Sequence, residues 1–351
     1  MLTRRTFTAM AAASIALPSS ATGRFYVPAE EAEHTRTFMQ WPVSRRVYGY
    51  DGFLGDVQRT IAEIANTIAD FEPIVMLAHR DDHRAARRLL SEAVELWDVP
   101  TEDLWARDSG PLFAVDGEGG KRVQSLNFNG WGNKQVHKRD GRIAERVADI
   151  LGLELSPSNL AGEPGGVDQD GHGNLIAHES SWIIDNRNPG LSRGEIEAEL
   201  RRAFGTDRIV WAPGVRDLDV TDYHIDSLAR FTGPGRILIN LPDDPIPGEP
   251  FHEAALETHD ILEAAGFDIE VIPEPNRRRV RSDDFVASYV NYYVCNGAVI
   301  AAQFGDPETD AIAADALARH YPDREIVMLN ADNLGEIGGG IHCATQQQPR
   351  V

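Results

Sequence analysis

One cysteine of this chain lies where a reactive thiol is expected. Cys343 follows the three glycines at residues 338–340, in a predicted turn near the C-terminal end. Glycine has no Cβ, so backbone and substrate can approach closely, and the side chain that follows can project into a cleft. A thiolate nucleophile is therefore the leading interpretation. A structural cysteine buried beside a turn is the alternative, and the turn by itself favours that alternative.

Further polar residues could bind or activate a substrate beside such a thiol. His224 and Asp226 are two positions apart, so on a strand both side chains would point to the same face. A solvent-facing polar stripe has the same spacing and stays open as the alternative. Asp108 precedes Ser-Gly-Pro and is predicted to lie at a strand-to-turn junction, either in the site or as a turn cap bonded to its own backbone. With Cys343, these groups supply a nucleophile, a base and two carboxylates.

Metal chemistry and protease chemistry are not expected. Residues 168–173 (DQDGHG) have the composition of a calcium loop but lack its twelve-residue spacing and closing glutamate, so a tight β-hairpin is predicted there. The chain has only two cysteines and no CxxC pair, which argues against zinc. A papain-type cysteine opens a helix near the mature N-terminus, whereas Cys343 lies at the other end. The sequence therefore predicts no metal and no cofactor.

The composition excludes some partners. The chain has 351 residues, 42% hydrophobic and 25% charged, with a formal net charge of -21 and acidic residues spread along its length. A negative field repels nucleic acid and attracts small cations, although many acidic proteins carry such a charge for solubility alone. Cys295 belongs to an apolar run, residues 289–295, that predicts a buried strand, so a disulfide with Cys343 is not favoured. The sequence leaves a homo-oligomer open.

The first 23 residues resemble an export signal. Arg4 and Arg5 precede a weakly apolar, alanine-rich stretch, and small residues at 19–21 form a cleavage pattern. The stretch is much shorter than the ~20 residues that a membrane span requires. We therefore expect a twin-arginine signal at residues 1–23, recognition by the twin-arginine translocation machinery, and a periplasmic or otherwise exported mature protein, residues 24–351, outside the membrane.

The elements that must position these residues repeat along the chain. Five times an amphipathic helix pattern is followed by a β-branched or apolar run. The pairs are residues 54–69 and 73–77, 142–151 and 153–155, 193–204 and 208–211, 252–265 and 268–272, and 308–320 and 325–329. Further strand patterns lie between them, at 111–115, 174–177 and 236–240. The recurrence predicts one cyclic α/β array, and a doubly wound α/β sheet is the alternative.

Separated motifs over nearly the whole mature chain resemble those of the agmatine deiminase family, which is related to bacterial peptidylarginine deiminase. They are VPAE at 27–30, WP at 41–42, WARDSGP at 105–111, LNFNGWG at 126–132, RNP at 187–189, HID at 224–226, SYVN at 288–291, QFGD at 303–306 and GGGIHCATQQQP at 338–349. The resemblance implies a single catalytic domain with the five-bladed α/β propeller fold of the guanidine-modifying superfamily. It also implies cleavage of a guanidinium without any cofactor or metal.

The resemblance also implies roles for individual residues. Cys343 would be the nucleophile, His224 the general acid and then base, and Asp108 and Asp226 the carboxylates that bind the guanidinium. Glu163 is the nearest match to a further acidic binding residue, although an inserted proline separates it from Gly-Gly, and Asp168 could fill that position instead. Trp105, in the WARDSGP motif, is assigned to the substrate pocket.

The implied reaction is deimination of agmatine to N-carbamoylputrescine and ammonia through a covalent thiouronium intermediate. Peptidylarginine or free arginine is the alternative substrate, because an export signal is unusual for an enzyme of polyamine biosynthesis. An exported protein that binds guanidines or polyamines with a degenerate site is a third hypothesis. The presence of the thiol, the imidazole and both carboxylates disfavours it.

Overall fold

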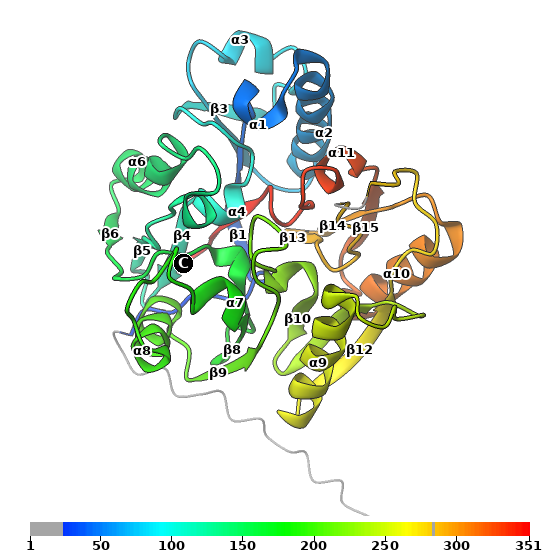
Figure 1. Ribbon diagram of the computed structural model, residues 1–351. Helices are drawn as coiled ribbons and strands as arrows, with labels where there is room; N and C mark the ends of the chain where they lie inside the picture. Colours follow the sequence, from blue (N-terminus) through cyan, green and yellow to red (C-terminus); the bar gives the residue numbers. More distant parts are fainter. Residues whose placement is uncertain (1–23, 283–284) are drawn as a thin grey trace, which may run out of the picture.

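Five small β-sheets form the framework of the computed structural model, which describes residues 24–282 and 285–351 (Figure 1). The strands of the first sheet are β1 (His34–Gln40), β2 (Ile74–Ala78), β3 (Val94–Asp98) and β16 (Gln346–Pro349). The other sheets comprise β4 (Leu112–Val115), β5 (Lys121–Gln124) and β6 (Glu154–Ser156); β7 (Val167–Gln169), β8 (Asn174–His178) and β9 (Arg208–Ala212); β10 (Ala229–Gly233), β11 (Arg236–Leu241) and β12 (Asp268–Pro273); and β13 (Tyr293–Cys295), β14 (Ala298–Ala302) and β15 (Glu325–Leu329). The sheets are arranged around one centre, as expected for a five-bladed α/β propeller.

Each sheet repeats one pattern: an antiparallel pair, then a parallel pair whose strands are joined through a helix. The five joining helices are α2 (Asp51–Ala69), α6 (Ile143–Leu151), α8 (Arg193–Phe204), α9 (Pro250–Ala264) and α10 (Pro307–His320). These are the five helix–strand pairs that the sequence pattern predicts. The doubly wound alternative is wrong, because the strands of the described residues form five separate sheets.

The first sheet is built from both ends of the described chain. β16 pairs antiparallel with β1, and Phe38 lies opposite Gln346. The pairing brings the turn that carries Cys343 beside residues 105–109, and the backbone N–H of Arg107 donates to the Cys343 carbonyl at 3.0 Å. The nucleophile candidate therefore reaches the centre of the molecule because its following strand completes the N-terminal sheet.

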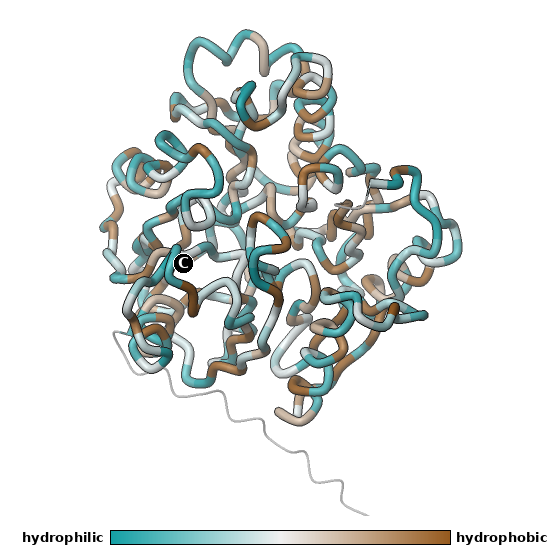
Figure 2. Tube along the Cα trace, in the orientation of Figure 1, coloured by the Kyte–Doolittle hydropathy of each residue, from teal (hydrophilic) through white to brown (hydrophobic). Residues whose placement is uncertain are grey.

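Local signals set the helix boundaries. Ser192 and Glu195 form a capping box at the start of α8, and Gly205 ends that helix in the left-handed conformation with φ 69°. Val57, Ile61 and Ile64 of α2 are buried at helical spacing against the first sheet. Figure 2 shows the resulting alternation of hydrophilic and hydrophobic residues along the outer helices. Within the described residues, no helix has the length and apolar character needed to cross a membrane.

Two local predictions are wrong. His224 and Asp226 do not lie on a strand: His224 precedes a turn of 3₁₀-helix, Ile225–Ser227, that leads into β10. Asp108 lies in the short helix α4 (Ala106–Ser109) rather than at a strand end. The hairpin predicted at residues 168–173 is confirmed, because β7 and β8 pair antiparallel across it. Cys295 lies in the buried strand β13, and both cysteines are free thiols.

Candidate active site

Cys343 lies in the loop between α11 (Asp332–Gly335) and β16, among buried polar side chains. Only 9% of the residue is exposed. The side-chain amide of Asn291 donates to the sulfur at 3.2 Å, and Asp226 Oδ2 lies 3.6 Å from it. The thiol is therefore in contact with the carboxylate that the sequence pairs with it, and its small exposed area restricts the reagents that can reach it.

The carboxylate of Asp108 belongs to the same group of buried polar side chains. The indole N–H of Trp131 donates to Oδ2 at 2.9 Å, and the backbone N–H of Gly165 donates to Oδ1 at 3.2 Å. Both donors lie far away in the sequence, which excludes the alternative of a turn cap bonded to its own backbone. Two fixed donors orient the carboxylate and favour its charged form.

His224 stands between two carboxylates. Its Nδ1 lies 3.7 Å from Asp108 Oδ2, and its Nε2 lies 3.3 Å from Glu163 Oε2. The 3₁₀ turn after His224 carries Asp226 to the thiol, so one short segment delivers both side chains although it is not a strand. An imidazole with an anion beside each nitrogen is well placed to hold two protons and give one away.

Gly165 lies where the acid and base groups meet. A Cβ at this position would lie 2.6 Å from Asp108 Oδ1, 2.9 Å from His224 Nδ1 and 3.2 Å from Asp226 Oδ2. Three titratable side chains from two segments of the chain, α4 and the turn at residues 224–226, therefore converge on the backbone of Gly165. Only a residue without a side chain fits between these groups, and this is why a glycine is needed here.

Glu163 is held by Arg187 rather than by solvent. Arg187 Nε lies 3.0 and 2.9 Å from the two carboxylate oxygens, and its Nη1 donates to Asp222 at 2.7 Å. Lys134 reaches Asp222 at 2.7 Å from a partly exposed position. Glu163 and Arg187 are both buried, so this chain of charges runs from near the surface to His224.

Replacing Arg187 by methionine is expected to lower the free energy of unfolding by about 3–5 kcal/mol, because Glu163 and Asp222 would lose their shared buried cation. Urea unfolding of both proteins measures the difference. Arg202→Met is the matched control: Arg202 is an exposed arginine of α8, and a loss of at most about 0.5 kcal/mol is expected. Equal losses in the two variants would contradict the structural role of Arg187.

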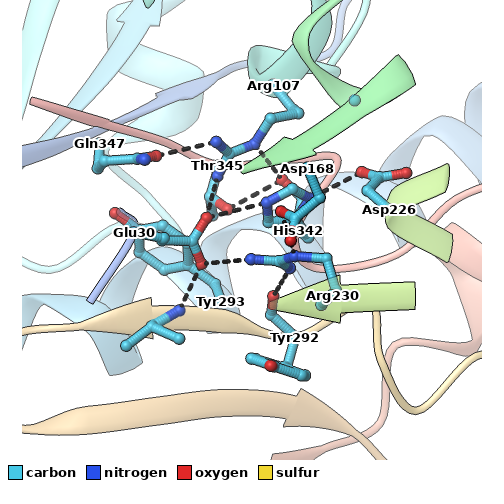
Figure 3. A network of polar contacts seen from close by, with 12 residues as sticks. Glu30, Arg107, Asp168, Asp226, Arg230, Tyr292, Tyr293, His342, Thr345 and Gln347 are labelled. Atoms are coloured by element: carbon cyan, nitrogen blue, oxygen red, sulfur yellow. Dashed lines mark hydrogen bonds and ion pairs between the residues drawn. The ribbon is translucent and has the colours of Figure 1, made fainter. Parts of the chain in front are cut away.

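Asp168 and Trp105 contact other groups than His224. Asp168 accepts from Arg230 Nε at 2.9 Å and from the backbone of Phe231, in the network of Figure 3. Trp105 is buried against the glycine turn, where a Cβ on Gly339 would lie 2.5 Å from its ring. The structure therefore brings Glu163, and not Asp168, to His224, and it places Trp105 against the backbone that carries Cys343.

Burial and mutual repulsion shift the titration of these groups. Burial, assisted by Glu163 and Asp226, raises the pKa of Asp108 to about 6 despite the nearby His224. Burial alone would lower the pKa of His224, but Asp108, Glu163 and Asp226 together raise it to about 9. Burial followed by repulsion from Asp226 and Asp108 raises the pKa of Cys343 well above its usual value. Without a bound cation, the site thus holds a protonated thiol and an imidazolium.

The loops beside the site are held in an uncommon backbone conformation. Trp131 has φ 54° and Tyr223 has φ 66°, although both are bulky residues. Trp131 reaches Asp108, and Tyr223 directly precedes His224. The link from Lys134 to Asp222 ties the two loops together. A strained backbone of this kind persists only where the surrounding structure enforces it. Here the two strained residues help to position Asp108 and His224.

Sequence reasoning did not assign a role to Asn291, Gly165, Arg187, Glu30 or His342. Asn291 carried a signal, because it is a polar residue within an otherwise apolar run and is buried beside the thiol. Glu30 and His342 occur in motifs, but only the fold brings them together. Within residues 24–282 and 285–351, no group of three histidine, cysteine or acidic residues is arranged to hold a metal ion.

Comparison with known proteins gives the family. The sequence profile of the Porphyromonas-type peptidyl-arginine deiminases matches residues 26–349. A protein of Streptomyces coelicolor is 35% identical over 93% of this chain and 99% of its own length. The agmatine deiminase of Stutzerimonas stutzeri is 32% identical over 93% of this chain and 95% of its own. The solved agmatine deiminase of Enterococcus faecalis superposes with a TM-score of 0.85 at 26% identity, covering 93% of this chain and 96% of that one. The chain therefore belongs to the agmatine deiminase family, within the Porphyromonas-type peptidyl-arginine deiminases.

Proposed function

We propose that the protein hydrolyses a guanidine compound, most directly agmatine, to a ureido compound and ammonia. The observation that carries the proposal is the convergence of Asp108, His224 and Asp226 on the backbone of Gly165, with Cys343 in contact with Asp226. A planar guanidinium matches two carboxylates with paired N–H donors, and a nucleophile beside them can attack its central carbon. Agmatine deiminases among the relatives support this choice of substrate.

In the first step, Asp108 and Asp226 bind the edges of the guanidinium. Burial and the nearby carboxylates keep Cys343 protonated in the free site. The positive charge of the substrate offsets the carboxylates, so the thiol releases its proton to solvent and the thiolate forms as the substrate arrives. The sulfur forms a bond to the guanidinium carbon. His224 gives its proton to one nitrogen, the C–N bond breaks, and ammonia leaves. The product of this step is a cationic thiouronium linked to Cys343.

In the second step, water replaces ammonia. His224, now neutral, accepts a proton from that water while its oxygen bonds to the thiouronium carbon. The C–S bond then breaks, the departing sulfur takes the hydroxyl proton of the intermediate and becomes a thiol again, and the neutral ureido product leaves. Glu163, 3.3 Å from the Nε2 of His224, stabilises the imidazolium at both stages. The proton that the thiol releases to solvent at the start equals the proton that converts the released ammonia to ammonium, so the protons balance over the whole cycle.

A bell-shaped pH dependence of kcat/KM for agmatine is expected. Asp108 binds as a carboxylate, so kcat/KM should rise with pH through about 6; His224 must be protonated at the start, so kcat/KM should fall above about 9. Initial rates between about pH 5 and about pH 10 measure both limbs. Trp131→Phe removes a donor from Asp108 and should move the acid limb to higher pH. If the acid limb of kcat/KM stayed at the same pH in Trp131→Phe, its assignment to Asp108 would be wrong.

The substrate is tested by ammonia and ureido-product release from agmatine, free arginine and an arginine-containing peptide in parallel. Agmatine turnover well above the other two supports the proposal. If only the peptide or only free arginine were turned over, that compound would be the substrate instead of agmatine, and the proposed reaction would still hold. Tight binding without release of ammonia would instead identify a guanidine-binding protein with a degenerate site.

We further propose that the protein is exported after folding. The proposal rests on Arg4 and Arg5 before a short apolar stretch, all of which lies outside the residues that the structure describes. Exchange of both arginines for lysine should retain the protein in the cytosol, as measured by cell fractionation. If the wild type and the lysine variant were distributed in the same way between the cytosol and the exported fraction, export by the twin-arginine route would be contradicted.

A further inference from the structure

The proposed mechanism leaves one buried titratable residue of the site without a role. His342 directly precedes Cys343 and is buried, and its imidazole lies between two carboxylates. Nδ1 lies 2.7 Å from Asp226 Oδ2, and Nε2 lies 2.9 Å from Glu30 Oε2 (Figure 3). Asp226 Oδ2 is also the oxygen in contact with the sulfur of Cys343. One ring therefore links the nucleophile's own backbone to a carboxylate of the substrate site.

The partners of Glu30 show that it is ionised. It accepts from Arg107 at 2.8 Å and from the backbone of Val294 at 2.9 Å, and it lies 3.2 Å from Arg230. A carboxylate surrounded by two guanidinium groups has no proton to donate. The Nε2 of His342 must then donate to Glu30, which leaves Nδ1 as the atom that decides the protonation state of the ring.

The charge balance of the cluster decides the state of Nδ1. Asp226 also lies near the His224 imidazolium, which joins this cluster to the charges around Glu163. The connected carboxylates are Glu30, Asp108, Glu163, Asp168, Asp222 and Asp226, and the connected cations other than His342 are Arg107, Lys134, Arg187, His224 and Arg230. With a neutral His342 the cluster would contain one uncompensated negative charge inside the protein, which is costly. With an imidazolium at position 342, six cations balance six anions, and both ring nitrogens of His342 donate.

From this geometry we infer that His342 is a positioning residue, an imidazolium that orients Asp226 toward the guanidinium and holds it ionised. The inference rests on the proposed function, in which Asp226 binds the cation. Glu30 and the two arginines act through His342 and do not touch the substrate. The charged groups that face His342 are Asp226 and Glu30, with Arg107 close to its carbonyl at 3.4 Å. Consistent with this arrangement, Asp226 has a lowered pKa despite its burial, chiefly because of His342.

The test uses the rates at which two similar reagents alkylate Cys343. A 2-haloacetamidine is a cation that resembles the guanidinium, whereas the 2-haloacetamide has nearly the same shape and is neutral. In the wild type, the carboxylates should make the cationic reagent react faster. His342→Asn keeps a donor for Asp226 but removes the charge, so the rate ratio of cation to neutral reagent should fall at least about tenfold. For agmatine, KM should rise more than kcat falls.

Two further variants serve as a second test and as a control. Glu30→Gln removes the anion that stabilises the imidazolium and should change the rate ratio in the same direction, which keeps the inference testable if His342→Asn does not fold. His172→Asn changes an exposed histidine and should leave the ratio unchanged. An unchanged ratio in folded His342→Asn, as judged by thermal unfolding, overturns the inference. Absence of agmatine turnover by the wild type counts against the proposed function instead, and the alkylation ratio remains measurable in that case.

Discussion

Replacing Cys343 by alanine is expected to lower kcat for agmatine at least ~10⁴-fold, because no other described group can form the covalent intermediate at that position. Binding of agmatine should persist, since Asp108 and Asp226 retain their carboxylates and the variant removes only one buried sulfur. Ammonia release measures the first effect. An increase in melting temperature with added agmatine measures the second.

Cys295→Ser is the matched control for this loss. Cys295 lies in β13, and its sulfur lies 3.5 Å from the carbonyl of Ala298, which a serine hydroxyl can also approach. Turnover should stay close to that of the wild type. If alanine at position 343 left turnover intact, the covalent mechanism would be wrong; if serine at position 295 abolished it, the loss at 343 could not be assigned to chemistry.

Gly165→Ala is expected to lower kcat/KM for agmatine at least ~10²-fold. The added methyl group would lie within 2.6 Å of Asp108 and 2.9 Å of His224, so at least one of them must move away from its position. Displacement by about 1 Å is sufficient for such a loss. The φ of Gly165 is not in the left-handed region, so the substitution itself does not strain the backbone.

Gly194→Ala provides the comparison. Gly194 is exposed in α8, and no atom lies within 4 Å of the added Cβ. In a helix this exchange should stabilise the protein by about 1 kcal/mol and leave kinetics unchanged. Steady-state rates and thermal unfolding of the two glycine variants separate a local effect on the site from a general effect of the methyl group. Equal activity of the two variants would mean that Gly165 does not border the reacting groups.

The five repeats were predictable because their signals are local. The apolar spacing of α2 and the capping box at Ser192 act within a few residues, and the chain folds as those patterns indicate. The pairing of β16 with β1 was not predictable in this way. It joins residues about as far apart as the described chain permits, and no short-range pattern in either strand specifies the partner.

In the candidate site, too, local features were predictable and long-range contacts were not. Cys343, His224, Asp108 and Asp226 were identified from residue types and from the family resemblance, but the prediction that His224 and Asp226 lie on a strand was wrong, since a 3₁₀ turn delivers both side chains. Glu163 and Asp168 could not be separated from sequence. Their difference arises from Arg187 and Arg230, cations brought from other parts of the chain.

The pairing of β16 with β1 also sets the order in which the protein can become active during its synthesis. Cys343 and the strand that anchors it leave the ribosome after all the other described groups of the site. A nascent chain can form its middle blades first, but it has no nucleophile until translation has passed residue 343. A fragment that ends before residue 343 therefore lacks both the nucleophile and the strand that completes the first sheet.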